Sequence, residues 1–248
     1  IPDLSGKVAI VTGANTGIGI VTARELARKN AHVFVASRSK ERDSYQSPFG
    51  LTQDGIQDQF GVNHIGHFLF TLLLLPTIKA SAPSRIVNVS SLGHHYPPPG
   101  GIEFDKLNDP NGHTSFQRYT QSKLANILFT LELNKKLSGT NVYCNCLHPG
   151  AINTELTRGL VSNWGYWIKP IVDTISAIFL LTPDDGALTQ LYCATSPEIE
   201  EKNHRGKYFI PYGELGETSD FGKDEELAKK LWDFSENLVK EKLGNDVL

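Results

Sequence analysis

Short apolar runs alternate with glycine-rich and helical stretches in the N-terminal part of the chain. Residues 7–12 (KVAIVT) and 32–37 (HVFVAS) are rich in β-branched and apolar side chains, which is typical of buried parallel strands. Between them, residues 13–19 are rich in glycine, and residues 20–29 carry apolar side chains at helical spacing. Strands that alternate with helices indicate a parallel sheet, so this part predicts a strand–loop–helix–strand unit.

The same alternation of helix and strand continues to the end of the chain. No repeat or linker interrupts it, so we expect one α/β domain over residues 1–248 with a doubly wound parallel sheet. The last helix has one apolar stripe, which we expect to dock on the body of the protein. The expected elements are helices at 52–79, 116–137 and 224–243, strands at 85–91, 142–147 and 207–211, and a long surface loop at 94–115.

The composition fits one domain that binds a small molecule. The 248 residues are 40% hydrophobic and 21% charged, which is enough for a sizeable core. A net charge of −3 without a basic cluster argues against a nucleic-acid partner. The three cysteines predict no disulfide framework. Cys144 and Cys146, two apart in a predicted strand, are expected to pack in the core, as is Cys193.

The apolar runs are too short to predict a membrane span. The two longest, 68–76 and 175–181, are far below the ~20 residues that a spanning helix needs. No secretory signal is visible, and the free cysteines favour a reducing compartment. We therefore expect a cytoplasmic protein without a transmembrane segment, with peripheral association of the run at 175–181 as the alternative.

The glycine-rich turn Thr12–Gly19 (TGANTGIG) lies between a predicted strand and a predicted helix. Glycines let the backbone turn tightly and approach a pyrophosphate, and the helix N-terminus presents free N–H groups. This position in a strand–helix–strand unit favours a dinucleotide site, and a tight turn without a ligand is the alternative.

Ser37 and Arg38 follow the second predicted strand. Dinucleotide folds carry an acidic residue about 20 positions after the glycines when they bind the ribose 2′-hydroxyl, and a basic residue when they accommodate a 2′-phosphate. Arg38 stands in that position, which favours NADP over NAD; a solvated surface arginine is the alternative.

Tyr119 and Lys123 are four residues apart on the helix predicted at 116–137. Positions i and i+4 share a helix face, so the ammonium group can approach the phenol. A nearby cation favours the phenolate and lowers a tyrosine pKa from its usual ~10. The pair therefore predicts proton transfer to a carbonyl oxygen or from an alcohol, although such a spacing also occurs by chance.

Further motifs stand around this pair: Asn63 in VNHIGH, Ser91 in VNVSS, and HPG at 148–150. Together with the glycine turn, and in this order, they resemble the classical short-chain dehydrogenase/reductase family. The segments QFGVNHIGHF, PSRIVNVSS, SKLANILF and LHPGAINTEL are similar to the branch that contains the retinol dehydrogenases and the WW domain-containing oxidoreductase. The resemblance covers nearly the whole chain and implies a three-layer Rossmann fold.

The resemblance implies a role for each matched residue. Ser91, rather than the adjacent Ser90, would hold the substrate oxygen beside Tyr119. Lys123 would bind the nicotinamide ribose, and Asn63 would order a water that passes protons to Lys123. The residues expected to bind NADP(H) are Gly13, Asn15, Thr16, Gly17, Ile18, Gly19, Ser37, Arg38, Tyr119, Lys123, Pro149, Gly150, Ile152 and Thr154.

The function expected from these residues is NADP(H)-linked interconversion of a hydrophobic carbonyl compound and its alcohol. The aromatic region 156–181 favours a hydrophobic substrate, and the family implies dimerisation through the helices that contain Asn63 and Tyr119. A non-catalytic dinucleotide-binding sensor or scaffold is the alternative. A binding module has no need of Asn63, Ser91, Tyr119 and Lys123 together.

One stretch, which we call the seam, does not fit the family. It is residues 42–55 (RDSYQSPFGLTQDG), where the family carries further helices and two further strands. Removing a strand from the middle of a sheet leaves backbone groups without partners at ~1–3 kcal/mol each where they are buried. We therefore expect that a segment near residues 43–47 has been omitted or is disordered; a natural splice form or an engineered deletion that repacks is the alternative.

Two histidine pairs have weaker claims to function. His64 and His67 share a helix face but have no evident third ligand, so we expect packing and no metal site. His94 and His95 lie with Tyr96 in the Pro/Gly-rich loop, where we expect solvated side chains; an edge of a pocket is the alternative.

Overall fold

The computed structural model describes residues 1–37, 48–150 and 181–247. Its first unit is the predicted strand–helix–strand. β1 (Val8–Thr12) and β2 (His32–Ala36) pair in parallel, with Val8 opposite His32 and Thr12 opposite Ala36. The connecting helix α1 (Gly17–Arg28) begins three residues earlier than its apolar spacing indicates, at the second glycine of the turn. The N-terminal prediction is confirmed.

A second sheet has the strand order β3–β4–β5–β6. The strands β3 (Ser84–Val89), β4 (Val142–Leu147) and β5 (Tyr208–Ile210) are parallel, as predicted. The short β6 (Glu214–Leu215), which the sequence pattern did not indicate, returns antiparallel to β5. The turn between them uses positive φ angles at Tyr212 (69°) and Gly213 (80°).

The helices confirm most of the predicted ones but differ in their bounds. The helix expected from Thr52 begins at Asp58, because Leu51 bridges Gln57 across a tight turn in which Gly55 has φ +75°. The helices are α2 (Asp58–Phe60), a π-helical turn (Gly61–Ile65), α3 (Gly66–Ala80), α4 (Ser115–Lys136), α7 (Pro183–Thr195), α8 (Glu198–Glu201) and α9 (Glu225–Leu243). Short 3₁₀ turns lie at Leu92–His95, Phe104–Lys106, Pro211–Gly213, Phe221–Lys223 and Asn245–Val247.

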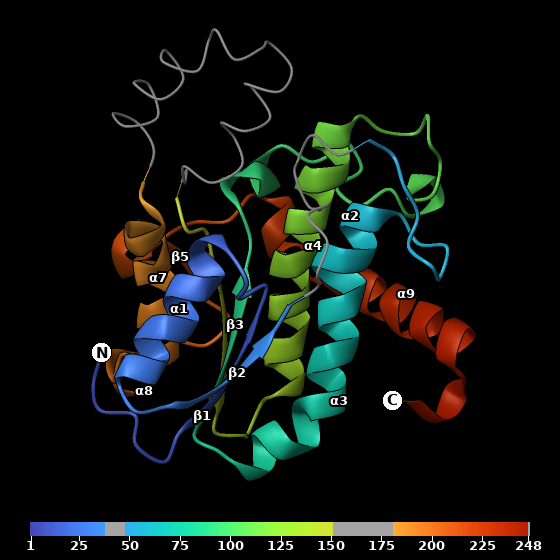
Figure 1. Cartoon of the computed structure of the whole chain (residues 1–248). Coiled ribbons are helices and arrows are strands. Elements are labelled where there is room, and N and C mark those ends of the chain that lie inside the picture. Colours follow the sequence, from blue (N-terminus) through green and yellow to red (C-terminus); the bar gives the residue numbers. More distant parts are fainter. Residues whose placement is uncertain (38–47, 151–180, 248) are drawn as a thin grey trace, which may run out of the picture.

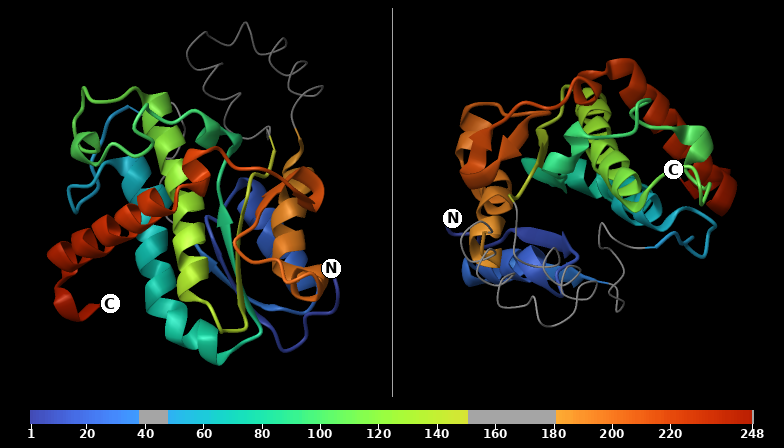
Figure 2. Two further views of the ribbon diagram at one scale, coloured as in Figure 1. Left: turned by 180° about the vertical axis from the view of Figure 1, so that it is seen from behind. Right: turned by 90° about the horizontal axis from the view of Figure 1, so that it is seen from above.

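Helices cover both faces of the second sheet (Figures 1 and 2). α7 packs on one face of β3 and β4 and also against α1, while α3 and α4 pack on the opposite face. Side chains alternate accordingly along β3: Ile86 belongs to the core beneath α4, and Val87 and Val89 pack toward α7. This is the three-layer, doubly wound arrangement expected from the sequence. All three cysteines are buried and free, as predicted.

α4 is the central helix of this core. Thr114 caps its N-terminus in a reciprocal capping box with Gln117, which satisfies two otherwise unpaired N–H groups. Its middle is buried on nearly every side, with Leu124, Leu128 and Leu133 fully enclosed. α9 lies across it and contributes the apolar stripe of Leu227, Leu231, Phe234 and Leu238 to the same cluster. The predicted docking of the last helix is confirmed.

Within the described residues, the two sheets are separate: no ladder of hydrogen bonds joins β1 to β3. One face of β1 and β2 packs on α1 through Ala9, Val11 and Val33. On the opposite face, Val8, Ile10 and Phe34 are 66%, 44% and 54% exposed. The loss of a central strand leaves an unpaired edge, and the loss of a helix beside it leaves an uncovered apolar face such as this one. The expected omission near the seam therefore has a visible consequence, although residues 42–47 lie outside the described part of the chain.

One helix in the described residues, Asp58–Ala80, is long and apolar enough by length and composition to cross a membrane. Only 28% of its most apolar window is buried. The core helix of a water-soluble protein passes the same test, so the finding does not by itself indicate a membrane span. The apolar run at 68–76 is shorter than the helix that contains it, so run length alone underestimated the length of this apolar helix.

Because one face of β1 is exposed, replacing isoleucine by alanine should lower the free energy of unfolding much less in β1 than in β3. Ile86→Ala removes a buried side chain and should lower the free energy of unfolding by about 2–5 kcal/mol. Ile10→Ala alters an exposed side chain and should cost about 1 kcal/mol or less. Urea unfolding of the two variants measures both values. Equal, large losses would show that the face of β1 is covered in solution.

Candidate active site

The glycine turn after β1 is built for close backbone approach. Gly13 and Gly17 have φ of +63° and +56°, which favour glycine, and the N–H of Gly13 donates to Ala36 O at 2.8 Å. A Cβ on Gly19 would lie 2.2 Å from the carbonyl oxygen of Gly13, so only glycine lets the helix pack on the turn. Thr16 makes no side-chain cap, which leaves the first N–H groups of α1 free for an anion.

The other residues predicted to bind the cofactor are only partly described. Asn15 and Thr16 are exposed on the turn, whereas Ile18 packs inward against the α1–α7 contact. Ser37 is exposed directly after β2. Pro149 and Gly150 follow β4, and Gly150 has φ +98°. Arg38, Ile152 and Thr154 lie outside the described residues, as does the aromatic region 156–180.

Tyr119 and Lys123 share a face of α4, as their spacing predicts. The Nζ atom of Lys123 lies 5.6 Å from the centroid of the Tyr119 ring and donates to Val89 O at 3.5 Å. Val89 is the last residue of β3. The cation therefore stands between the phenol ring and the carboxyl end of a parallel strand, which is the edge where α/β sheets bind ligands.

Ser91 lies on the same side of this strand end as Tyr119. The two residues flank Gly93: a Cβ added there would lie 3.4 Å from Cε1 of Tyr119 and 3.5 Å from Oγ of Ser91. Ser91 Oγ accepts a hydrogen bond from Gly93 N–H at 3.1 Å. Ser90 instead is buried, and its hydroxyl donates to Lys123 O at 2.7 Å. The geometry thus leaves Ser91, and not Ser90, beside the tyrosine ring.

Asn63 is connected to the same helix through one serine. Its Nδ2 donates to Ser122 Oγ at 3.0 Å, and this hydroxyl donates to Tyr119 O at 2.7 Å. Asn63 lies in the π-helical turn Gly61–Ile65. Such turns often mark functional sites in helices, and no pattern in the sequence indicated this one. The proton-relay role of Asn63 stays a prediction.

The histidines differ from one another. His64 is fully buried, packs among Phe60, Phe68 and Phe129, and hydrogen-bonds Ser235 Oγ at 2.7 Å, which confirms the packing interpretation for this residue. The same interpretation is wrong for His67, whose side chain is exposed. Burial lowers the pKa of His64 to about 3. Among the residues that the structure describes, no group of three or more His, Cys, Asp or Glu side chains lies so as to hold a metal ion.

The prediction of a solvated loop is wrong for His94. His95 and Tyr96 are exposed as expected, but His94 has no exposed surface. It is enclosed because its ring packs on Tyr208 of β5 and its nitrogens bond to backbone groups on two segments. The loop is therefore anchored through this side chain.

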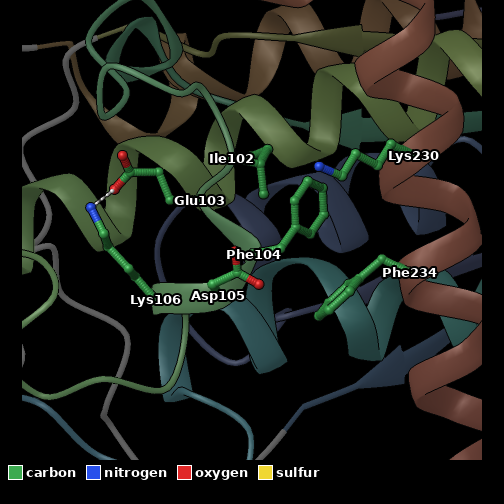
Figure 3. Close-up of a pocket in the computed structure, with 7 residues that line it drawn as sticks. All are labelled: Ile102, Glu103, Phe104, Asp105, Lys106, Lys230 and Phe234. Atoms are coloured by element: carbon green, nitrogen blue, oxygen red, sulfur yellow. Dashed lines mark hydrogen bonds and ion pairs between the residues drawn. The ribbon is translucent and has the colours of Figure 1, made fainter.

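A shallow pocket lies away from these residues (Figure 3). It is formed between the turn Phe104–Lys106 and α9, where Lys230 lies over the Phe104 ring at 4.9 Å. Its lining residues are Ile102, Glu103, Phe104, Asp105, Lys106, Lys230 and Phe234. It contains none of the predicted site residues.

The fold is doubly wound α/β, with a glycine turn after its first strand. Serine, tyrosine and lysine lie together at the end of another strand. This combination is typical of a nucleotide-dependent oxidoreductase of Rossmann type. Comparison with known proteins specifies the family. The family model for short chain dehydrogenases matches residues 7–47. Human retinol dehydrogenase 14 is 36% identical over 302 residues, covering 95% of this chain and 87% of its own, and mouse retinol dehydrogenase 11 is 37% identical over 287 residues with the same coverages.

The chain therefore belongs to the short-chain dehydrogenase/reductase family, in its retinol dehydrogenase branch. A solved structure of an uncharacterized protein from Mycobacterium paratuberculosis superposes with a TM-score of 0.72 at 28% identity, over 97% of this chain and 96% of its own. The family interconverts carbonyl and alcohol groups with a nicotinamide dinucleotide, and this chain is an oxidoreductase of that class.

The comparison also bears on the expected missing segment. An alignment of 302 positions over a chain of 248 residues leaves at least 54 positions that retinol dehydrogenase 14 fills and this chain does not. The family model ends at residue 47, inside the seam. Together with the separate sheets, this supports a missing internal segment.

Replacing glycine by alanine should change the free energy of unfolding differently at two helical glycines, because only one of them lies against backbone. Gly19→Ala places a methyl group against backbone and should lower the free energy of unfolding by about 1–3 kcal/mol. Gly66→Ala in α3 meets only Gly61 O at 3.4 Å and should be neutral or stabilise by up to about 1 kcal/mol. Thermal unfolding measures both. A Gly19→Ala variant as stable as Gly66→Ala would contradict the close approach.

Proposed function

We propose that the protein catalyses the NADP(H)-linked interconversion of a hydrophobic aldehyde or ketone and its alcohol. The observation that carries the proposal is the arrangement of Ser91 and Tyr119 on the two sides of Gly93, with Lys123 beside the tyrosine ring. This arrangement leaves a hydroxyl donor and an acid–base group at one edge of the sheet. A substrate carbonyl oxygen bound there can accept a hydrogen bond from each of them.

Each residue has one task in this proposal. Bound NADPH supplies the hydride. Tyr119 donates a proton to the carbonyl oxygen, and Ser91 holds that oxygen by a hydrogen bond. Lys123 provides the positive charge that favours the tyrosinate after transfer, and Asn63, which braces the same helix through Ser122, orders the water that returns the proton.

The glycine turn fits the dinucleotide. Its free N–H groups and the close approach at Gly19 suit a pyrophosphate at the N-terminus of α1. Ser37 and Arg38 would select NADP through the 2′-phosphate, and Pro149, Gly150 and the residues after them would contact the nicotinamide side. These cofactor contacts rest on the sequence motif and on the described part of the turn.

The hydrophobic substrate class is supported by the relatives. Two of the most similar are named retinol dehydrogenases, and retinol is a hydrophobic alcohol. The aromatic region 156–181 points in the same direction from the sequence. The homodimer and the cytoplasmic location remain predictions.

A specific observation favours the second candidate, a non-catalytic dinucleotide-binding protein. The sheets are separate in the described residues, so β1 and its glycine turn lack a hydrogen-bonded connection to β3 and Ser91. If this separation moves the cofactor away from Tyr119, binding persists without turnover. NADPH oxidation with a panel of hydrophobic aldehydes and ketones distinguishes the two candidates.

Replacement of the catalytic phenol tests the first candidate directly. Tyr119→Phe should lower turnover by roughly 10²–10⁴-fold with NADPH affinity largely retained, because only the transferable proton is removed. Tyr143→Phe, the same change at the start of β4, is the matched control and should leave turnover unchanged. Undiminished turnover in Tyr119→Phe would remove this residue from its role.

The 2′-phosphate contact is tested by cofactor preference. Arg38→Ala should weaken NADPH binding by roughly 10–100-fold and leave NADH binding nearly unchanged, because a charged hydrogen bond is worth ~1.5–3 kcal/mol. Arg28→Ala, at the exposed end of α1, is the control. Dissociation constants from fluorescence titration decide the question, and an equal loss for both cofactors would refute the contact.

A further inference from the structure

The turn that carries Ser91 is held by one buried side chain. The carbonyl oxygen of Ser91 accepts two hydrogen bonds from His94: one from its backbone N–H at 3.1 Å and one from ring atom Nδ1 at 2.7 Å. Ser91 caps the short turn Leu92–His95, and its own hydroxyl accepts from Gly93 N–H. His94 therefore closes the turn on which the serine hydroxyl is presented to Tyr119.

The other side of the same ring is bound to a distant segment. The backbone N–H of Ser219 donates to Nε2 of His94 at 3.1 Å, and the Ser219 hydroxyl donates to His94 O at 3.4 Å. The Ser219 hydroxyl in turn accepts from Gly222 N–H at 3.2 Å. The imidazole thus joins the Ser91 turn to the segment that leads from β6 to α9.

The two partners determine which ring nitrogen carries the proton. A carbonyl oxygen only accepts, so Nδ1 must be protonated; a backbone N–H only donates, so Nε2 must be bare. Both conditions hold together only for the neutral imidazole with its proton on Nδ1. Protonation of Nε2 would place two donors against each other and break the link to Ser219.

The surroundings of the ring maintain this neutral form. His94 has no exposed surface, its ring lies 4.0 Å from that of His95, and Tyr208 packs edge-on at 5.0 Å. Burial is the main cause that lowers the pKa of His94 to about 4; the bond to Ser91 opposes this shift, and the nearby His95 and His148 add to it. At neutral pH both hydrogen bonds are therefore present.

We propose that His94 is a positioning residue for Ser91: its Nδ1–H bond to the Ser91 carbonyl fixes the serine hydroxyl opposite Tyr119, and its Nε2 bond to Ser219 anchors the turn. The part of this inference that concerns turnover rests on the proposed function. The part that concerns the geometry of the turn does not.

Two amide substitutions separate the two bonds. An asparagine amide reaches the place of Nδ1, so His94→Asn can keep the donor to the Ser91 carbonyl and loses Ser219. A glutamine amide reaches the place of Nε2, so His94→Gln keeps a partner for Ser219 and loses the donor to Ser91. His94→Phe fills the volume and loses both bonds. His95→Asn, at the exposed neighbour, is the matched control.

Hydrogen exchange of the Gly93 amide gives a readout that needs no catalysis, because this N–H is bonded to Ser91 Oγ. We expect protection close to wild type in His94→Asn and His95→Asn, and a loss of tenfold or more in His94→Gln and His94→Phe. Equal protection in all four variants would overturn the proposal, whether or not the protein reduces a carbonyl compound.

Kinetics give the second readout. With an active wild-type protein, kcat should fall at least tenfold in His94→Gln and His94→Phe, remain within about threefold of wild type in His94→Asn, and leave NADPH affinity unchanged in all three. If thermal stability falls equally in His94→Asn and His94→Gln while kcat is also equal, His94 is only a packing residue and the proposal is wrong. An inactive wild-type protein would instead contradict the proposed function, and the exchange experiment would still decide the role of His94.

Discussion

The docking of the carboxyl end of β3 on α4 determines where Ser91, Tyr119 and Lys123 lie relative to one another. The Val89 carbonyl accepts from both Lys123 Nζ and Asn126 Nδ2, at 3.5 and 3.2 Å, and Ser90 Oγ donates to Lys123 O at 2.7 Å. These contacts tie the last residues of a strand to one turn of a helix. Because they are largely buried, losing a partner would leave an unpaired polar group at ~1–3 kcal/mol. Ser91 therefore leaves the strand at a defined place beside Tyr119.

The nucleotide half of the molecule is held by a different kind of contact. In the described residues, β1 and β2 meet the rest of the protein through α1 and α7 and not through a continuous sheet. Val21 and Leu26 of α1 pack on Ala187 and Leu191 of α7, and Gln190 Nε2 donates to Ile18 O at 3.2 Å. Apolar packing is less directional than a strand ladder. The alignment with retinol dehydrogenase 14 contains at least 54 positions that this chain does not fill.

Local patterns were sufficient for most of the fold and for the helix face that Tyr119 and Lys123 share. The strands β1 to β5 are dense in β-branched and apolar residues, and α4 and α9 have long periodic faces, so their sequence signals agree with their tertiary roles. The spacing of Tyr119 and Lys123 also determined their shared helix face. Family resemblance then indicated Ser91 over Ser90, which the hydrogen bonds of the two hydroxyls agree with.

What the sequence did not indicate depends on partners far along the chain or on subtle backbone geometry. His94 was expected in solvent because its loop is rich in proline and glycine, but Ser219, 125 residues away, binds its ring. The π-helical turn around Asn63 has no recognisable pattern, and the late start of α2 depends on the turn at Gly55. These features surround the candidate site, where local preference is most often overruled by tertiary contacts.

The measurement that tests the central claim most directly is the fate of the transferred hydrogen. The protein would be incubated with NADPH carrying deuterium at the transferable C4 position and a long-chain hydrophobic aldehyde, and the alcohol formed would be analysed by mass spectrometry. If the site built on β3 and α4 is a working reductase, the alcohol gains one deuterium on its carbinol carbon. Failure to form alcohol, or an alcohol without deuterium, would contradict it.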